Sequence, residues 1–134
     1  MSRTLGRNFA WMIQSRFDFT RTVQLLEDSI KEAGNHVFAV IDQAAAAESV
    51  GMKLRPTTLI IFGNPKGGTP LMDAFPRVAL ELPLKLLVWD ENGTVNVAYT
   101  PMAETVARYG LGGMEARIAA MDAAVAALVK TIAQ

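Results

Sequence analysis

Residues 82–99 read LPLKLLVWDENGTVNVAY, and this stretch decides how the predicted sheet is arranged. Two apolar segments, 82–90 and 95–99, have the residue content of β-strands, and the second alternates between its two faces. The short connection between them contains Asn92-Gly93, the dipeptide best suited to the left-handed positions of a tight hairpin turn. A hairpin reverses the chain, so these two strands must be antiparallel, and a doubly wound parallel sheet is disfavoured.

The other elements follow from the spacing of apolar residues. Alternation over 9–19 predicts a half-buried strand, and helical spacing over 20–33 predicts a helix with Thr20 as its N-cap. From Met114 to Ile132 the spacing predicts an amphipathic helix of about 20 residues that packs on the sheet, with a coiled-coil seam as the alternative. Further strands are predicted at 37–42 and 58–62, and short helices at 44–49, after Thr69-Pro70, and from Pro101 to about Tyr109.

This order of elements predicts an α+β fold. We expect one domain, residues 1–134, built as a two-layer sandwich with a mainly antiparallel sheet of about five strands and helices on one face. Hydrophobic residues make up 51% of the chain and charged residues 19%, which is typical of a globular domain rather than a disordered segment.

Composition excludes several classes of function. The chain has no cysteine and one histidine, His36, so thiol catalysis and cysteine- or multi-histidine metal sites are excluded within one chain, and no metal or cofactor is predicted. Thirteen basic and thirteen acidic residues give zero net charge, which disfavours nucleic acid as a partner. No long apolar window predicts a membrane span or signal peptide, so we expect a soluble, cytoplasmic protein.

The segment 62–73, FGNPKGGTPLMD, has the glycine content of a phosphate-binding loop. Thr69 stands where such a loop needs lysine, so a nucleotide triphosphatase is disfavoured. Two interpretations remain. Gly67, Gly68 and Lys66 offer backbone N–H groups and a positive charge to a small anion. Alternatively, the glycines only supply positive φ angles for a turn, and Thr69 caps the helix that begins at Pro70.

Two charged residues lie at unusual places in predicted strands. Lys85 interrupts the apolar strand 82–90, where a half-buried amine serves as a base or a Schiff-base nucleophile, although a solvated lysine or one paired with Glu81 or Asp42 is the simpler interpretation. Asp42 ends the strand 37–42 and either contributes to a site or caps the alanine-rich helix that follows.

Several motifs in combination give the chain a family resemblance. I-D-x-A-A at 41–45, P-T-x-L-I-I-F-G-N-P at 56–65, G-T-P-L-M at 68–72, and L-P-L-K with V-W at 82–89 resemble the family called domain of unknown function 302. The resemblance implies a compact α+β domain of β-α-β-β-β-β-α order, like one half of the TATA-box-binding-protein fold in shape only, and it implies dimers. The positions that match the family pattern are Asp42, Asn64, Pro65, Thr69, Pro70, Met72, Pro83 and Lys85.

No catalytic role comes with these matches, and two positions depart from the family pattern. Gln43 stands where the family often has histidine, which places an acid–base role there in doubt, and Glu81 stands where it often has aspartate. The leading hypothesis is a non-catalytic, homodimeric module that binds a small ligand, with an anion as the candidate. Its ligand-binding residues are predicted to be Asp42, Asn64, Lys66, Gly67, Gly68, Thr69 and Lys85.

Two alternatives belong to other functional classes. The first is an enzyme that uses Lys85 with Asp42 or Glu81 in acid–base or imine chemistry. The second is a protein-interaction module that acts through an exposed sheet face or edge.

Overall fold

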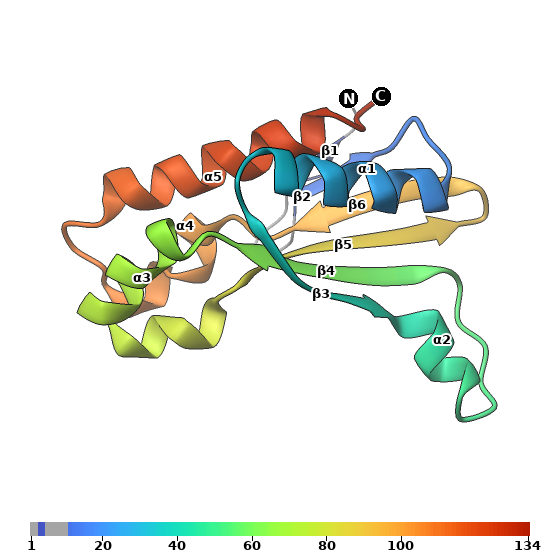
Figure 1. Ribbon diagram of the computed structural model, residues 1–134, viewed down its shortest axis with the longest axis horizontal. Coiled ribbons are helices and arrows are strands. Elements are labelled where there is room, and N and C mark those ends of the chain that lie inside the picture. The colour runs from blue at the N-terminus through green and yellow to red at the C-terminus, as the bar shows by residue number, and fades with distance from the viewer. Residues whose placement is uncertain (1–2, 5–10) are drawn as a thin grey trace.

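The computed structural model describes residues 3–4 and 11–134, and its centre is an antiparallel sheet (Figure 1). The spatial order of its six strands is β1-β2-β6-β5-β4-β3, and every neighbouring pair is antiparallel. The α+β class and the antiparallel sheet predicted from the sequence are therefore confirmed. The strands are β1 (Arg3–Thr4), β2 (Trp11–Gln14), β3 (His36–Asp42), β4 (Thr57–Gly63), β5 (Leu84–Glu91) and β6 (Thr94–Tyr99).

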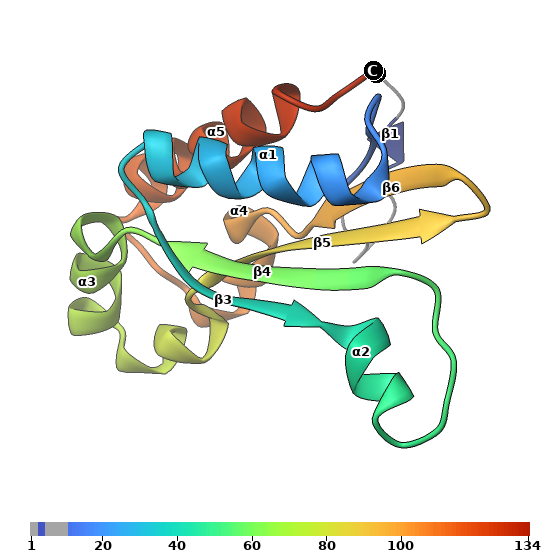
Figure 2. The same ribbon diagram turned by 45° about the vertical axis from the view of Figure 1, so that its right-hand side comes forward.

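The two long helices lie side by side on one face of this sheet (Figures 1 and 2). They are α1 (Phe19–Glu32) and α5 (Glu115–Lys130), and their apolar side chains form the main core with those of the central strands. The long C-terminal helix thus packs on the sheet, as predicted. Members of this core include Ile13, Leu26, Ile30, Ile60, Phe62, Leu86, Val88, Val97, Val125 and Leu128.

The shorter helices lie beyond the sheet or below its other face (Figure 1). They are the α-helices α2 (Gln43–Glu48), α3 (Pro65–Ala74) and α4 (Met102–Thr105), and the 3₁₀ helices η1 (Pro76–Glu81) and η2 (Ala107–Tyr109). A second apolar cluster joins α3, η1 and α4 to the first half of α5. Its buried members are Leu71, Val78, Met102, Val106, Leu111 and Ile118.

The hairpin between β5 and β6 has the predicted turn. Asn92 and Gly93 both have positive φ angles, 55° and 93°, as this tight turn requires. The Asp90 side chain accepts a hydrogen bond of 2.8 Å from the N–H of Gly93, which fixes the turn further. The register pairs Glu91 with Thr94, so the reversal falls where the sequence places it.

The structure corrects the beginning of the first helix. The strand predicted over 9–19 extends only to Gln14, and residues 9 and 10 lie outside the described part of the chain. Asp18, not Thr20, is the N-cap of α1, because its carboxylate accepts the N–H of Arg21 at 2.8 Å. An ionised carboxylate near the positive end of a helix is also a better acceptor than a hydroxyl.

The structure also corrects the helix predicted after Thr69-Pro70. Helix α3 begins at Pro65, so its N-cap is Asn64, whose side chain accepts the N–H of Lys66 at 3.0 Å. Pro70 lies inside the helix, and Thr69 is exposed. Asn64-Pro65 offers the same combination of a polar cap and a first-turn proline, five residues earlier and directly at the end of β4.

Candidate functional site

The backbone N–H groups in the first turn of α3 already donate hydrogen bonds to Asn64. Besides the bond from Lys66 to the Asn64 side chain, the N–H groups of Gly67 and Gly68 donate to the Asn64 carbonyl oxygen at 2.9 and 3.0 Å. The three N–H groups expected to face an anion are thus engaged by one residue. The alternative prediction, that these glycines supply positive φ angles, is wrong, because both lie in helical backbone and neither has one.

A cavity of about 160 Å³ lies against this turn. Gly68 is buried there, and a Cβ at this position would lie 3.5 Å from Leu82 and 3.6 Å from Met72. The wall is mostly apolar, so the cavity suits an apolar group rather than a bare ion. Its lining residues are Phe38, Gly63, Asn64, Pro65, Gly68, Thr69, Met72, Leu82, Pro83, Leu84 and Met121.

The cavity adjoins a groove of about 520 Å³ that runs along α5. Asn64, Leu84 and Met121 line both spaces, so the cavity and the groove lie next to one another. Arg117 lines the groove one helical turn before Met121, so both side chains lie on the same side of α5. Among the described residues Arg117 has no ion-pair partner, and it therefore brings an uncompensated positive charge to the groove.

Lys85 lines a different pocket, of about 310 Å³, on the face of the sheet that α1 and α5 leave open. Its side chain is exposed and lies on β5 opposite Ile61 of β4. Glu81 lines the same pocket from η1, and Thr105 lines it from α4. Leu59, Leu84, Leu87, Ala98, Tyr99, Thr100 and Met102 complete the wall.

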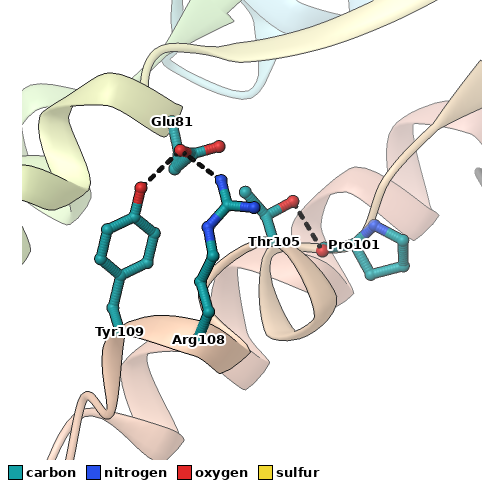
Figure 3. Close-up of polar contacts among 5 residues, drawn as sticks. All are labelled: Glu81, Pro101, Thr105, Arg108 and Tyr109. Carbon is teal, nitrogen blue, oxygen red and sulfur yellow. Dashed lines mark hydrogen bonds and ion pairs between the residues drawn. The ribbon is translucent and has the colours of Figure 1, made fainter. Parts of the chain in front are cut away.

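Glu81 is held in a network of hydrogen bonds (Figure 3). One oxygen, Oε2, accepts the Tyr109 hydroxyl at 2.6 Å and the Arg108 guanidinium at 2.9 Å. The Tyr109 hydrogen bond is the main cause that lowers the pKa of Glu81, while partial burial opposes it and the charges of Arg108 and Lys85 add to the lowering. Glu81 is therefore a fixed negative charge at neutral pH.

Asp42 lies away from both of these spaces. Its side chain caps α2 by accepting the N–H of Ala45 at 2.9 Å. Of the two alternatives predicted for Asp42, the helix cap is therefore confirmed. It pairs with Thr58, whereas Gly63, beside the α3 turn, pairs with His36 at the other end of β3. The strand separates Asp42 from that turn by roughly 20 Å, at about 3.3 Å per residue.

The predicted site residues thus fall in three places. Asn64, Gly68 and Thr69 line the cavity beside α3, and Gly67 lines the adjoining groove. Lys85 lies in the Glu81 pocket, and Asp42 caps α2. The sequence interpretation missed Phe38 and Arg117 as lining residues, because they carry no local motif.

Over residues 3–4 and 11–134, no group of three or more His, Asp or Glu side chains is placed to hold a metal ion. Within the same residues, no helix combines the length and apolarity needed to cross a membrane.

The fold and its pockets define a small α+β domain with an antiparallel sheet, two covering helices and an open face. The chain belongs to the family described as Domain of unknown function DUF302, whose model matches residues 11–131. It is also similar to the crystal structure of an uncharacterized conserved DUF302 protein from Bacillus stearothermophilus. The TM-score is 0.85 at 21% identity, with 92% of this chain and 98% of the other covered, which shows a shared fold.

Similar sequences also occur within longer proteins. The chain is 36% identical over 101 residues to proteins named Fluoride-specific ion channel FluC 1 in Brucella suis biovar 1 and Brucella abortus biovar 1. The match covers 75% of this chain, but only 40% and 37% of those proteins. The chain therefore spans about two fifths of the length of these curated relatives.

Proposed function

We propose that this protein is a non-catalytic, cytoplasmic module that binds a small ligand with an apolar body and an anionic group. The observation that carries the proposal is that the apolar cavity beside α3 lies next to the groove lined by Arg117 and shares Asn64, Leu84 and Met121 with it. The chain has no cysteine, which is compatible with a reducing compartment.

The volume of the cavity indicates the size of the apolar part. Apolar cavities of about 150 Å³ accept a molecule of the size of benzene. The cavity here measures about 160 Å³, and Phe38, Met72 and Met121 supply polarizable walls. An aromatic ring or a short branched alkyl group is therefore the expected body of the ligand.

The position of the charges indicates where the anionic group lies. Arg117 lines the groove beside the cavity, and Lys66 is exposed on the first turn of α3. A guanidinium binds a carboxylate through two parallel hydrogen bonds, which gives a preferred orientation. A small aromatic or aliphatic carboxylate therefore matches both spaces, with its ring in the cavity and its carboxylate towards Arg117.

A titration of the protein with benzoate, phenylacetate and uncharged benzyl alcohol tests this proposal by isothermal calorimetry. We expect a carboxylate to bind at least tenfold more tightly than the alcohol, and Arg117→Ala to remove that difference. Arg77→Ala, an exposed arginine on η1 outside both spaces, is the matched control. Equal binding of acid and alcohol to wild type, or no binding of any probe, would contradict the proposal.

Fluoride is a further probe in the same titration, because the longer relatives are named fluoride-specific ion channels. An apolar wall cannot replace the hydration shell of a small ion, and the first-turn N–H groups already donate to Asn64. We therefore expect sodium fluoride to bind no more tightly than sodium chloride in this titration. Binding of fluoride alone would favour an ion site over a carboxylate site.

A homodimer is the second part of the proposed function, and the distribution of exposed apolar residues supports it. Six of the seven large hydrophobic residues that are exposed in the described chain lie between 38 and 54, and only Leu80 lies elsewhere. This segment contains the edge strand β3 and the arm with α2 that projects beyond the sheet (Figure 2). The six are Phe38, Val40, Ile41, Val50, Met52 and Leu54.

An exposed apolar edge strand is suited to pairing with an identical strand. Antiparallel pairing of two β3 edges through a two-fold axis would satisfy their free backbone groups and bring the exposed apolar side chains of the two strands together. Light scattering coupled to size exclusion tests this, with Val40→Lys expected to give a monomer. Leu80→Lys, at an equally exposed residue outside the segment, should leave the dimer intact, and a wild-type monomer at micromolar concentration would refute it.

A further inference from the structure

Glu81 and Lys85 line one pocket but do not bind one another. The ion pair of Glu81 in the described chain is with Arg108, through Oε2 at 2.9 Å. The other oxygen, Oε1, accepts no hydrogen bond from a described residue, and Figure 3 shows it turned away from Tyr109. A carboxylate and an amine side chain thus line the same space of about 310 Å³ without forming an ion pair with one another.

The two groups differ in how firmly they are held. Tyr109 and Arg108 fix Glu81 from η2, so its charge and its orientation are set before any ligand arrives. Lys85 projects from β5 on a flexible stem and adjusts its position easily. Leu59 and Leu87, which pair across β4 and β5, add an apolar part to the lining.

We propose that this pocket, separate from the cavity beside α3, binds a free α-amino acid with an apolar side chain. The ammonium group donates to Glu81 Oε1, the carboxylate accepts from Lys85 Nζ, and the side chain packs against Leu59 and Leu87. A volume of about 310 Å³ lies at the lower end of small-molecule sites, as a ligand of this size requires.

The zwitterion fits better than a ligand with a single charge. An amine alone would leave Lys85 without a counter-charge, and a carboxylate alone would leave Glu81 Oε1 without a donor. A molecule with both charges on groups bonded to one carbon satisfies the two groups together, and each polar contact is strengthened because it involves an ion. The hydroxyl group of Thr105 donates to the Pro101 carbonyl at 3.2 Å, so it is not the main anchor for the ligand.

The first experiment compares L-leucine with its two half-molecules by isothermal calorimetry. The probes are L-leucine, 3-methylbutylamine and 4-methylpentanoate, which carry both charges, only the positive charge and only the negative charge. We expect leucine to bind at least tenfold more tightly than either analogue. No heat from leucine up to 10 mM, or equal binding of 4-methylpentanoate, would overturn the proposal, and the latter would indicate a simple anion site.

The second experiment removes each charge in turn. Lys85→Met keeps the apolar stem on an exposed position, and Glu81→Gln keeps the shape of the side chain. Each should weaken leucine binding at least tenfold, while Lys66→Ala, a lysine outside this pocket, should not change it. Unchanged affinity in Lys85→Met would overturn the proposal, and this variant decides the matter if Glu81→Gln proves unstable.

These outcomes are distinguishable from those of the carboxylate titration. Benzoate binding depends on Arg117, which lines the groove along α5, whereas leucine binding depends on Lys85 on the open face of the sheet. Arg117→Ala should therefore leave the leucine affinity unchanged. A loss of leucine binding in Arg117→Ala would place the amino acid in the other site and refute the assignment to this pocket.

Discussion

Asp122, in the middle of α5, accepts a hydrogen bond of 2.6 Å from the backbone N–H of Met102, at the first position of α4. Its second carboxylate oxygen accepts the N–H of Ala103 at 3.1 Å. Helix α4 has Pro101 at its N-cap, which offers no side-chain acceptor, so a residue from another helix supplies the cap. This contact ties α4, and with it one wall of the Glu81 pocket, to the long helix.

Asp122→Ala should destabilise the protein by about 1–2 kcal/mol, because two helix N–H groups lose a charged acceptor. Urea unfolding followed by circular dichroism measures the change. Asp73→Ala, which removes an exposed carboxylate near the end of α3, is the control and should change the free energy of unfolding by less than about 0.5 kcal/mol. An equal effect in both variants would contradict the capping role.

The beginning of α3 gives a second prediction, which separates two candidate caps. Asn64→Ala removes the side chain that accepts the Lys66 N–H and should cost about 1 kcal/mol. Thr69→Ala changes an exposed residue inside the helix and should be nearly neutral. Chemical denaturation of the two variants measures both values, and a larger loss in Thr69→Ala would restore the cap first predicted from the sequence.

The hairpin between β5 and β6 and the start of α3 show why the sequence predicts some features and not others. The Asn92-Gly93 hairpin was predictable because its turn depends only on the residues within it. At α3 the sequence offers two similar caps five residues apart, and the choice depends on where β4 ends and on the packing of Gly68 against Leu82. Local preference cannot rank them, because a contact with a distant residue decides.

The candidate site was less predictable than the fold for the same reason. The sequence places Asp42 and Gly63 at the ends of two apolar strands, but only the register shows that they lie at opposite ends of the pair. Likewise, Arg117 and Met121 are one turn apart on any helix, but their role depends on which side of α5 faces Asn64. Glu81 was recognised as a candidate partner of Lys85, whereas Tyr109, which orients it, was not.

The network around Glu81 makes stability depend on pH at the acid end. Its pKa is lowered in the folded protein, chiefly by the Tyr109 hydrogen bond. A lowered carboxyl pKa adds stability above the pKa of the unfolded chain, about 4.3, and this stability is lost as the pH falls through the lower folded value. Urea unfolding of wild type at neutral pH and at about pH 3 should therefore show a loss that includes this contribution.

Tyr109→Phe removes the main cause of the lowered pKa, so the loss between neutral and acid pH should become smaller. Glu81→Gln removes the titrating group itself, so in that background Tyr109→Phe should not alter the pH dependence further. A Tyr109→Phe effect of the same size with and without Glu81 would show that the pH dependence arises at other carboxylates.

Ser15 and Thr22 form a hydrogen bond between their side chains in the core. Their hydroxyl oxygens lie 2.6 Å apart in the core, and both side chains are buried. Thr22 donates to the Asp18 carbonyl at 2.7 Å, so Ser15 is the donor to Thr22, and Ser15 itself accepts the N–H of Phe17 at 3.1 Å. This chain of hydrogen bonds joins the end of β2 to the first turn of α1.

Thr22→Val keeps the shape of the side chain but leaves the Ser15 hydroxyl without its acceptor, which should cost about 1–3 kcal/mol. Ser15→Ala should also destabilise the protein, because the Phe17 N–H loses its partner. The double variant should lose less than the sum of the two by at least about 0.5 kcal/mol, since each substitution removes the same bond. Strictly additive losses in urea denaturation would show that the two hydroxyl groups act independently, and that α1 is positioned by its apolar face alone.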